Sequence, residues 1–121
     1  MAQEINVSVS LSATKGYLSE SVVTAVNPDM AGTRSFANVQ AIGTTHEVLV
    51  VNADIATAGW AYFRNLDATN YVELGVVVAA TFYPFAKLKA GVPQLIHLSS
   101  TAIYAKANTA ACDLKYIILE A

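Results

Sequence analysis

Apolar and polar residues alternate along most of the chain with a period of two. At the start of the chain, Ile5, Val7, Val9 and Leu11 alternate with asparagine and serine, which is the pattern of a half-buried β-strand. Further short runs rich in valine, isoleucine and aromatic residues follow, with turn signals between them and no convincing helix. The predicted strands cover residues 5–12, 21–26, 36–42, 46–51, 59–64, 71–78, 81–88, 94–98, 102–106 and 112–120. This pattern predicts an all-β protein, an antiparallel β-sandwich of jelly-roll type with about nine to eleven short strands, in a single domain over residues 1–121.

The segment from Gly59 to Val78 is predicted to be a central hairpin, because two apolar alternating runs flank a polar stretch, Asn65–Asn70. We expect this stretch to lie outside the core, since backbone groups in a turn need water or side-chain partners. In the first run, Trp60 and Tyr62 share one face. The strand at 81–88 contains Pro84 and therefore cannot hold a central position in a sheet throughout its length.

The composition points to contact with other proteins. Hydrophobic residues make up 55% of the chain and charged residues only 13%, about half the usual charged share. So few charges cannot cover the surface of a small domain, and apolar patches on a protein surface most often mark protein contacts. The formal net charge of -2 provides no basic field for nucleic acid or for a membrane surface.

No catalytic or metal-binding motif is recognisable in the sequence. It contains no Gly-x-Ser-x-Gly, P-loop or glycine-rich dinucleotide turn. His46 and His97 each lie within a strand pattern without neighbouring ligands, and the single cysteine, Cys112, is expected to be a small buried residue. We therefore expect a protein that is not an enzyme and that uses no cofactor and no metal. The N-terminus shows no signal peptide, and no apolar run approaches the roughly 20 residues of a membrane span.

Two apolar segments exceed what one thin sandwich can hide. They provide the candidate interface residues Phe82, Tyr83, Phe85, Ile117 and Leu119. Joining copies of the chain around a symmetry axis would bury both segments. The aromatic residues allow a second interpretation, in which Trp60 and Tyr62 form a platform that stacks on a glycan. Periodicity places these two side chains together but does not show whether their face is wet.

Three stretches carry a resemblance to a known group of proteins. FRNLDATNYVELG at residues 63–75 resembles a signature of small structural proteins of tailed-bacteriophage virions. FYPFAKLKAG at residues 82–91 and IYAKANTAACDLKYIILE at residues 103–120 are similar to later blocks of the same group. The resemblance covers roughly the C-terminal half. It implies a jelly-roll β-sandwich without enzyme activity that assembles around a capsid or tail axis, and decoration, cement and tail-associated roles all fit it.

Residues and resemblance together lead to one functional expectation. The protein is expected to be a capsid decoration (cement) protein, a homotrimer that binds neighbouring subunits of the major capsid protein or other virion proteins. It would be made in the host cytoplasm and reside in the virion, with no nucleic-acid or membrane partner. The alternative is a tail or fibre module that binds a host receptor or glycan. A small glycan-active enzyme is a third possibility.

Overall fold

A computed structural model describes residues 4–121 of the 121-residue chain. This range contains ten β-strands and no helix, and every pairing between strands is antiparallel. The strands are β1 (Val7–Lys15), β2 (Leu18–Val26), β3 (Ser35–Ile42), β4 (Glu47–Val48), β5 (Ala58–Asn65), β6 (Val72–Val78), β7 (Thr81–Leu88), β8 (Pro93–His97), β9 (Tyr104–Ala107) and β10 (Cys112–Glu120). The predicted all-β fold is confirmed.

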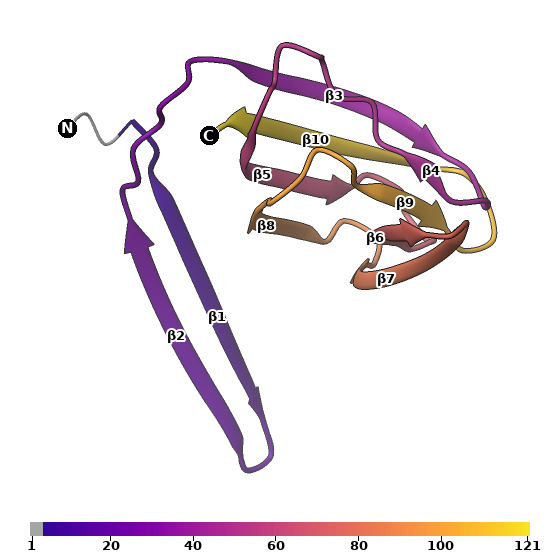
Figure 1. Cartoon of the computed structure of the whole chain (residues 1–121). Coiled ribbons are helices and arrows are strands. Elements are labelled where there is room, and N and C mark those ends of the chain that lie inside the picture. The colour runs from indigo at the N-terminus through magenta and orange to yellow at the C-terminus, as the bar shows by residue number, and fades with distance from the viewer. Residues whose placement is uncertain (1–3) are drawn as a thin grey trace. The chain divides into compact units, whose positions relative to one another are not determined.

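The strands group into two compact units that are described separately. The first extends to Gly32 and the second runs from Thr33 to Ala121. In the first unit, β1 and β2 form a two-stranded sheet, a long ribbon that turns at Gly16, whose φ of 57° suits glycine (Figure 1). The sequence placed these strands in one sandwich domain over residues 1–121. The two four-stranded sheets are built from residues 33–121, and the assignment of a single domain over residues 1–121 stays a prediction.

The second unit is a β-sandwich of two four-stranded sheets, with strand orders β3-β10-β5-β8 and β4-β9-β6-β7 (Figure 1). Four of the pairings join β3 with β10, β4 with β9, β5 with β8 and β6 with β7. These are the pairings of one long hairpin whose tip lies between β6 and β7 and whose length is distributed over two sheets. Each strand before the tip therefore pairs with the strand that lies equally far after it in the order of strands along the chain.

The core lies between the two sheets and takes every second side chain of the strands. On β10, Leu114, Tyr116 and Ile118 are buried, whereas Lys115 is exposed. On β5, Ala61 and Phe63 are buried, and Trp60 and Tyr62 share the opposite face as predicted. Fully buried side chains from both sheets include Ile42, Phe63, Val72, Leu74, Leu114, Tyr116 and Ile118.

The predicted hairpin between residues 59 and 78 is wrong. β5 and β6 belong to different sheets, so the stretch from Asn65 to Asn70 connects the two layers. The first residue of this stretch is fully buried rather than exposed, because the Asn65 amide donates hydrogen bonds to the carbonyl oxygens of Asn70 at 2.8 Å and Leu88 at 2.9 Å. The apolar faces of β5 and β6 thus meet across the core, where each buries the other.

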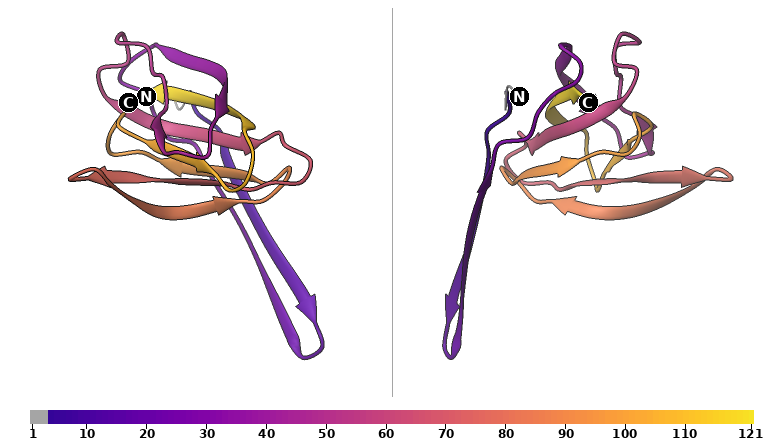
Figure 2. Two further views of the ribbon diagram at one scale, coloured as in Figure 1. Left: turned by 90° about the vertical axis from the view of Figure 1, so that its right-hand side faces the viewer. Right: turned by 60° about the vertical axis from the view of Figure 1, so that its left-hand side comes forward.

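The hairpin at this position in the sequence joins β6 and β7. Its two turn residues, Ala79 and Ala80, have φ values of 51° and 67°, which is the left-handed region. β7 is an edge strand, as Pro84 predicted. β9 pairs with β6 only as far as Gly75, so the distal part of the β6–β7 hairpin is a two-stranded projection from the sandwich (Figure 2).

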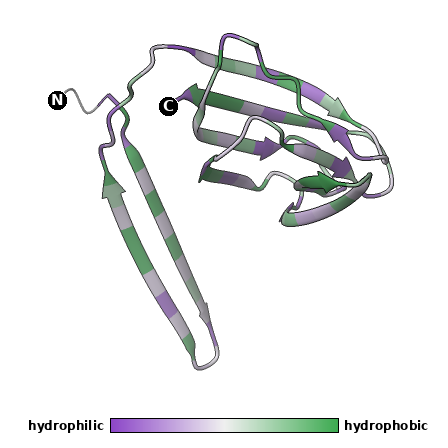
Figure 3. Ribbon diagram, viewed as in Figure 1, coloured by the Kyte–Doolittle hydropathy of each residue, from purple (hydrophilic) through white to green (hydrophobic). Residues whose placement is uncertain are grey.

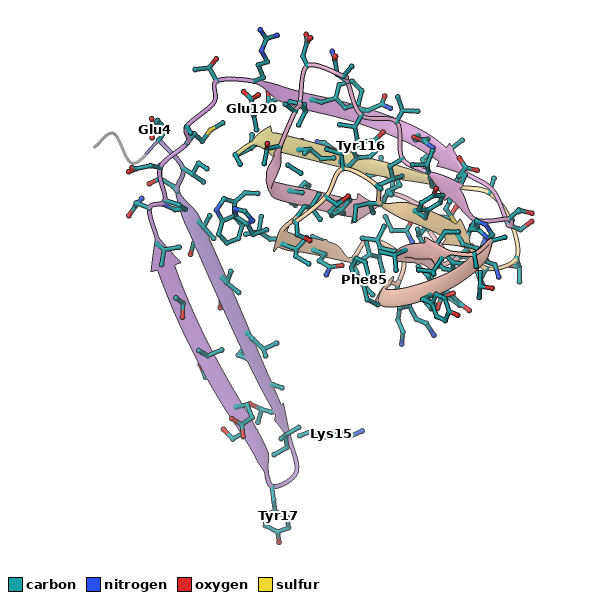
Figure 4. The ribbon with its side chains drawn as sticks, in the orientation of Figure 1. Glu4, Lys15, Tyr17, Phe85, Tyr116 and Glu120 are labelled. Carbon is teal, nitrogen blue, oxygen red and sulfur yellow. The ribbon has the colours of Figure 1, made fainter. Side chains whose placement is uncertain are left out.

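The predicted strand at residues 46–51 shrinks to the two residues of β4. The side chain of Gln40 replaces a strand partner there, because its amide accepts from the backbone N–H of Val50 at 3.0 Å and donates to the Val48 carbonyl at 3.2 Å. The Tyr116 hydroxyl also donates to the Val50 carbonyl from inside the core (Figure 4). Side chains therefore hold this segment in an irregular conformation.

Candidate interaction surfaces

The outward side of the β3-β10-β5-β8 sheet carries an apolar row that crosses all four strands. Ile117 lies directly opposite Ala37 on one side and Tyr62 on the other, and Tyr62 lies opposite Leu95. Side chains of directly opposed residues point to the same face of a sheet. We call Ala37, Ile117, Tyr62 and Leu95 the outer row; Leu95 is 38% exposed, and Ile117 and Tyr62 are half-buried.

A second row lies one step along the same face and adds the only positive charges beside the outer row among the described residues. It consists of Val39, Lys115, Arg64 and Pro93, each opposite its neighbour. Arg64 donates from Nε to the carbonyl oxygen of Gly91 at 3.3 Å, which holds its side chain toward the edge of the sheet. On the other side of the outer row, Trp60 lies opposite His97, and their rings meet edge to face with centroids 5.2 Å apart.

The structure thus brings together residues that the sequence assigned to two rival roles. Ile117, a candidate interface residue, and Trp60 and Tyr62, the candidate glycan residues, share this one face. Leu119 follows two positions after Ile117 and is half-buried next to a register shift between Ile118 and Glu120. The candidate protein interface and the candidate glycan platform therefore share one surface, and binding experiments distinguish the two roles.

The projecting part of the β6–β7 hairpin is the second surface. We call residues 76–85 the wing. Beyond Gly75, the wing exposes Val76 at 41%, Val78 at 60%, Tyr83 at 54% and Phe85 at 49%. Val76 and Tyr83 are direct partners, so they share a face. Figure 4 shows Phe85 on β7.

Phe82 is half-buried and contributes less to the exposed surface of the wing than Tyr83 and Phe85 do. Its ring stacks on His46 with centroids 5.8 Å apart, and His46 in turn meets Tyr104 edge to face at 6.2 Å. The Phe82 ring also covers Gly75, because a Cβ atom at that glycine would lie only 2.8 Å from it. Of the three aromatic residues predicted for an interface on this strand, two are exposed and Phe82 packs within the chain.

A pocket of about 460 Å³ lies between the wing, β8 and the loop that leads to β9. Its lining is mainly apolar and includes Val76, Phe85, Ile96, Leu98 and Ile103. The polar atoms come from His97, Ser99, Ser100 and Tyr104, and no carboxylate or lysine lines it. Such a lining suits an apolar side chain from a partner better than a charged ligand.

The described residues gather no cluster of metal-ligating side chains. Within residues 4–121, no group of three or more histidine, cysteine, aspartate or glutamate side chains gathers as a metal site would require. Cys112 is buried as predicted, and this burial raises the pKa of its thiol, which disfavours the reactive thiolate. No helix in the described part of the chain is long and apolar enough to cross a membrane.

The polar connection between the sheets is held by two side chains. The Asp67 carboxylate accepts hydrogen bonds from the backbone N–H groups of Asn70 at 2.7 Å and Thr69 at 2.9 Å, and these bonds lower the pKa of Asp67. Aspartate is a residue type that forms such Asx turns. Sequence analysis missed the role of Asn65, whose partner on β7 is remote in sequence, and no local signal could have revealed that contact.

Comparison of the chain with protein-family models, with curated protein sequences and with solved structures finds no match.

Proposed function

We propose that this chain is a non-enzymatic structural protein of a tailed-bacteriophage virion, a capsid decoration (cement) protein. In this role it associates with its own copies as a homotrimer and binds neighbouring subunits of the major capsid protein. It is made in the host cytoplasm and resides in the virion. The observation that carries the proposal is the outer row, an apolar strip that crosses a complete sheet and faces outward.

The chemistry of the outer row suits permanent contact with protein. Binding through charged groups requires that they lose their water, and this loss offsets much of the attraction between opposite charges. Lys115 and Arg64 are the charged side chains that interrupt the apolar character next to the row. The wing adds Tyr83 and Phe85, residue types that are enriched at the centres of protein interfaces. Two apolar surfaces on one small sandwich support contact with more than one neighbour.

The resemblance of residues 63–75, 82–91 and 103–120 to virion structural proteins supports the location. These stretches contain the end of β5, the strand that carries Tyr62. They also contain the exposed residues of β7 and the whole of β10. The resemblance also implies a jelly-roll topology, and the strand pairing supports it. A jelly roll is a double sheet of eight strands wound as two Greek keys. Eight strands, β3 to β10, make up the two sheets.

The number of copies in the particle tests the decoration role. Quantitative mass spectrometry of purified particles that contain this chain should find on the order of hundreds of copies, a number set by the symmetry of the shell. The major capsid protein of the same particles provides the internal standard. Copy numbers of a few to a few tens would contradict the decoration role and place the chain in the tail.

The alternative is a tail or fibre module that binds a host receptor or glycan. Trp60 and Tyr62 favour it, because both aromatic side chains lie on the outward side of β5 and are only partly buried. Aromatic rings at such positions can stack on sugars. Binding on a glycan array that is lost in Trp60→Ala and kept in Tyr83→Ala, a change on the wing, would establish this function. Absence of binding by the wild-type chain would remove it.

A further inference from the structure

The ribbon formed by β1 and β2, which we call the arm, has two chemically distinct faces. Its nine cross-strand pairs run from Val7 opposite Val26 to Lys15 opposite Leu18. Directly opposed residues and alternate residues along a strand share a face. Figure 3 shows the resulting alternation of hydrophobic and hydrophilic bands along both strands. Ser8, Ser10, Ser12, Thr14, Ser19 and Ser21 lie on one face, together with Val23 and Ala25.

The opposite face is apolar over most of its length and, beyond the buried Val7, exposed. It carries Val7, Val9, Leu11, Ala13, Leu18, Val22 and Val26, with Thr24 among them. Leu11 is 62% exposed, Val22 53% and Val9 48%. Within the described residues, β1 and β2 pair only with each other. An isolated two-stranded ribbon is at best marginally stable in water, and the arm therefore needs a partner that covers its apolar face.

The charges on the apolar face indicate what that partner is. Near the tip, this face carries one cation, Lys15 (Figure 4), and one anion, Glu20. They lie two positions apart along the ribbon, in the cross-strand pairs with Leu18 and Ala13. The ion pair found in the described part of the chain joins Arg34 to Asp54, so Lys15 and Glu20 do not form one with each other. A surface that matches both charges must present an anion and a cation at the same level. A second copy of the arm presents both.

We propose that the arms of neighbouring copies of this chain pack together in parallel through their apolar faces. Rotation about an axis along the arms places β1 of one copy against β2 of the next. Leu11 then meets Val22 of the neighbour, Lys15 approaches Glu20 of the neighbour, and the serine face remains in water. This association uses a surface that is independent of the outer row and does not depend on a role in a virion.

The size of the arm determines how strong the association is. Nine residues at about 3.3 Å each give a length of about 30 Å, and two strands about 4.8 Å apart give a face about 10 Å wide. The resulting ~300 Å² per copy is well below the ~800 Å² per partner of a standard interface. Arm packing alone is therefore a weak contact. It reinforces other contacts between the same copies by holding them at high local concentration.

Cysteine cross-linking of the full chain tests the arrangement. Mixed Leu11→Cys and Val22→Cys variants, oxidised together, should form a covalent dimer between the two variants. The matched control is a mixture of Ser10→Cys and Val23→Cys, which are direct partners on the serine face and should cross-link far less. The buried Cys112 is common to all four variants. Equal yields from both mixtures, or no cross-link from the first, would overturn the proposal.

Charge exchange tests the parallel direction and does not rely on new cysteines. Lys15→Glu and Glu20→Lys should each weaken self-association by at least about ten-fold, as measured by sedimentation over a concentration series. The double variant should restore it, because the two charges merely exchange positions. The fluorescence of Trp60, the only tryptophan of the chain, reports whether the sandwich remains folded in each variant. A dissociation constant unchanged in both single variants would show that the arms do not meet in this way, as would a monomer at every concentration.

Discussion

The side-chain amide of Asn65 donates a hydrogen bond to the carbonyl oxygen of Leu88 at 2.9 Å and thereby joins the end of β5 to the end of β7 in the opposite sheet. The same amide bonds to the carbonyl oxygen of Asn70, and its Oδ1 accepts from the backbone N–H of Asp67 at 2.9 Å. Asn65 is the one buried polar residue among the described side chains. This single side chain fixes the point at which the chain passes from one layer to the other.

Asn65→Ala should lower the free energy of unfolding markedly. It leaves the buried carbonyl oxygen of Leu88 and the part-buried carbonyl oxygen of Asn70 without their donor, and an unsatisfied buried group costs about 1–3 kcal/mol. Urea unfolding followed by Trp60 fluorescence measures the loss. The control is Ala68→Ser in the same connection, where the residue is exposed and the change should stay within about 0.5 kcal/mol. Equal effects of the two changes would show that Asn65 does not hold the sheets together.

Leu74→Ala should cost about 2–5 kcal/mol, because it opens a cavity at a fully buried position in the core. Val78→Ala, on the same strand but 60% exposed in the wing, is the matched control and should cost far less in the isolated chain. The same urea titration measures both. A small effect of Leu74→Ala would contradict the placement of the Leu74 side chain in the core between the two sheets.

The turn between β6 and β7 should be improved by a sequence that suits its backbone. Ala79 and Ala80 both have positive φ, whereas two-residue hairpin turns of this kind favour Asn-Gly. Left-handed backbone costs roughly 1–2 kcal/mol for a residue with a Cβ atom. The combined change Ala79→Asn and Ala80→Gly should therefore raise the free energy of unfolding by about 1–2 kcal/mol.

Gly91→Ala is the reverse experiment at a turn outside the hairpin. Gly91 has a φ of 75°, and a Cβ atom there would meet no other atom within 4 Å. The loss should therefore come from the backbone alone and amount to about 1 kcal/mol. If the combined Ala79→Asn and Ala80→Gly variant is no more stable to urea than the wild type, Ala79 and Ala80 are not strained.

The Asp67 carboxylate should make the fold sensitive to acid. Its pKa is lowered from 3.8 in the folded chain, chiefly by the backbone hydrogen bonds from Asn70 and Thr69. The folded state therefore favours the ionised form, so the contribution is fully present above the unfolded pKa and is lost as the pH falls through the folded value. Unfolding midpoints in urea between about pH 5 and pH 2 should fall less steeply for Asp67→Asn than for the wild type. Asp113→Asn, at an exposed position on β10, is the control, and parallel curves for all three chains would exclude this role.

Pro84 was sufficient to predict the edge position of β7, and the alternation of apolar residues predicted most of the strands and the buried face of β10. It could not predict which strands pair, because the stretch from Asn65 to Asn70 has the polar composition of both a hairpin turn and a connection between sheets. Its identity depends on the bond from Asn65 to Leu88, which lies in a distant part of the sequence. The true hairpin at Ala79 and Ala80 gave no signal, because alanine rarely adopts positive φ.

The candidate surfaces were partly foreseeable. Composition indicated that apolar side chains would be exposed, and Tyr83 and Phe85 are exposed while Ile117 is half-buried. Their part in an interface stays a prediction. Periodicity could not show that Ile117 and Tyr62 come from strands that lie side by side, because that depends on the order of strands in the sheet. The arm was missed for a similar reason. The alternation of apolar residues on β1 is the same whether its apolar face packs within the chain or is exposed for contact with a second chain.

The mass of the intact chain in solution tests the central claim, which is that its exposed apolar surfaces join copies of the protein. Light scattering coupled to size exclusion at micromolar concentration should give about 38 kDa, three times the 12.8 kDa of one chain. Ile117→Lys, which places a charge in the centre of the outer row, should shift the peak toward the monomer without unfolding the sandwich. A single wild-type peak at the mass of one chain would contradict the account.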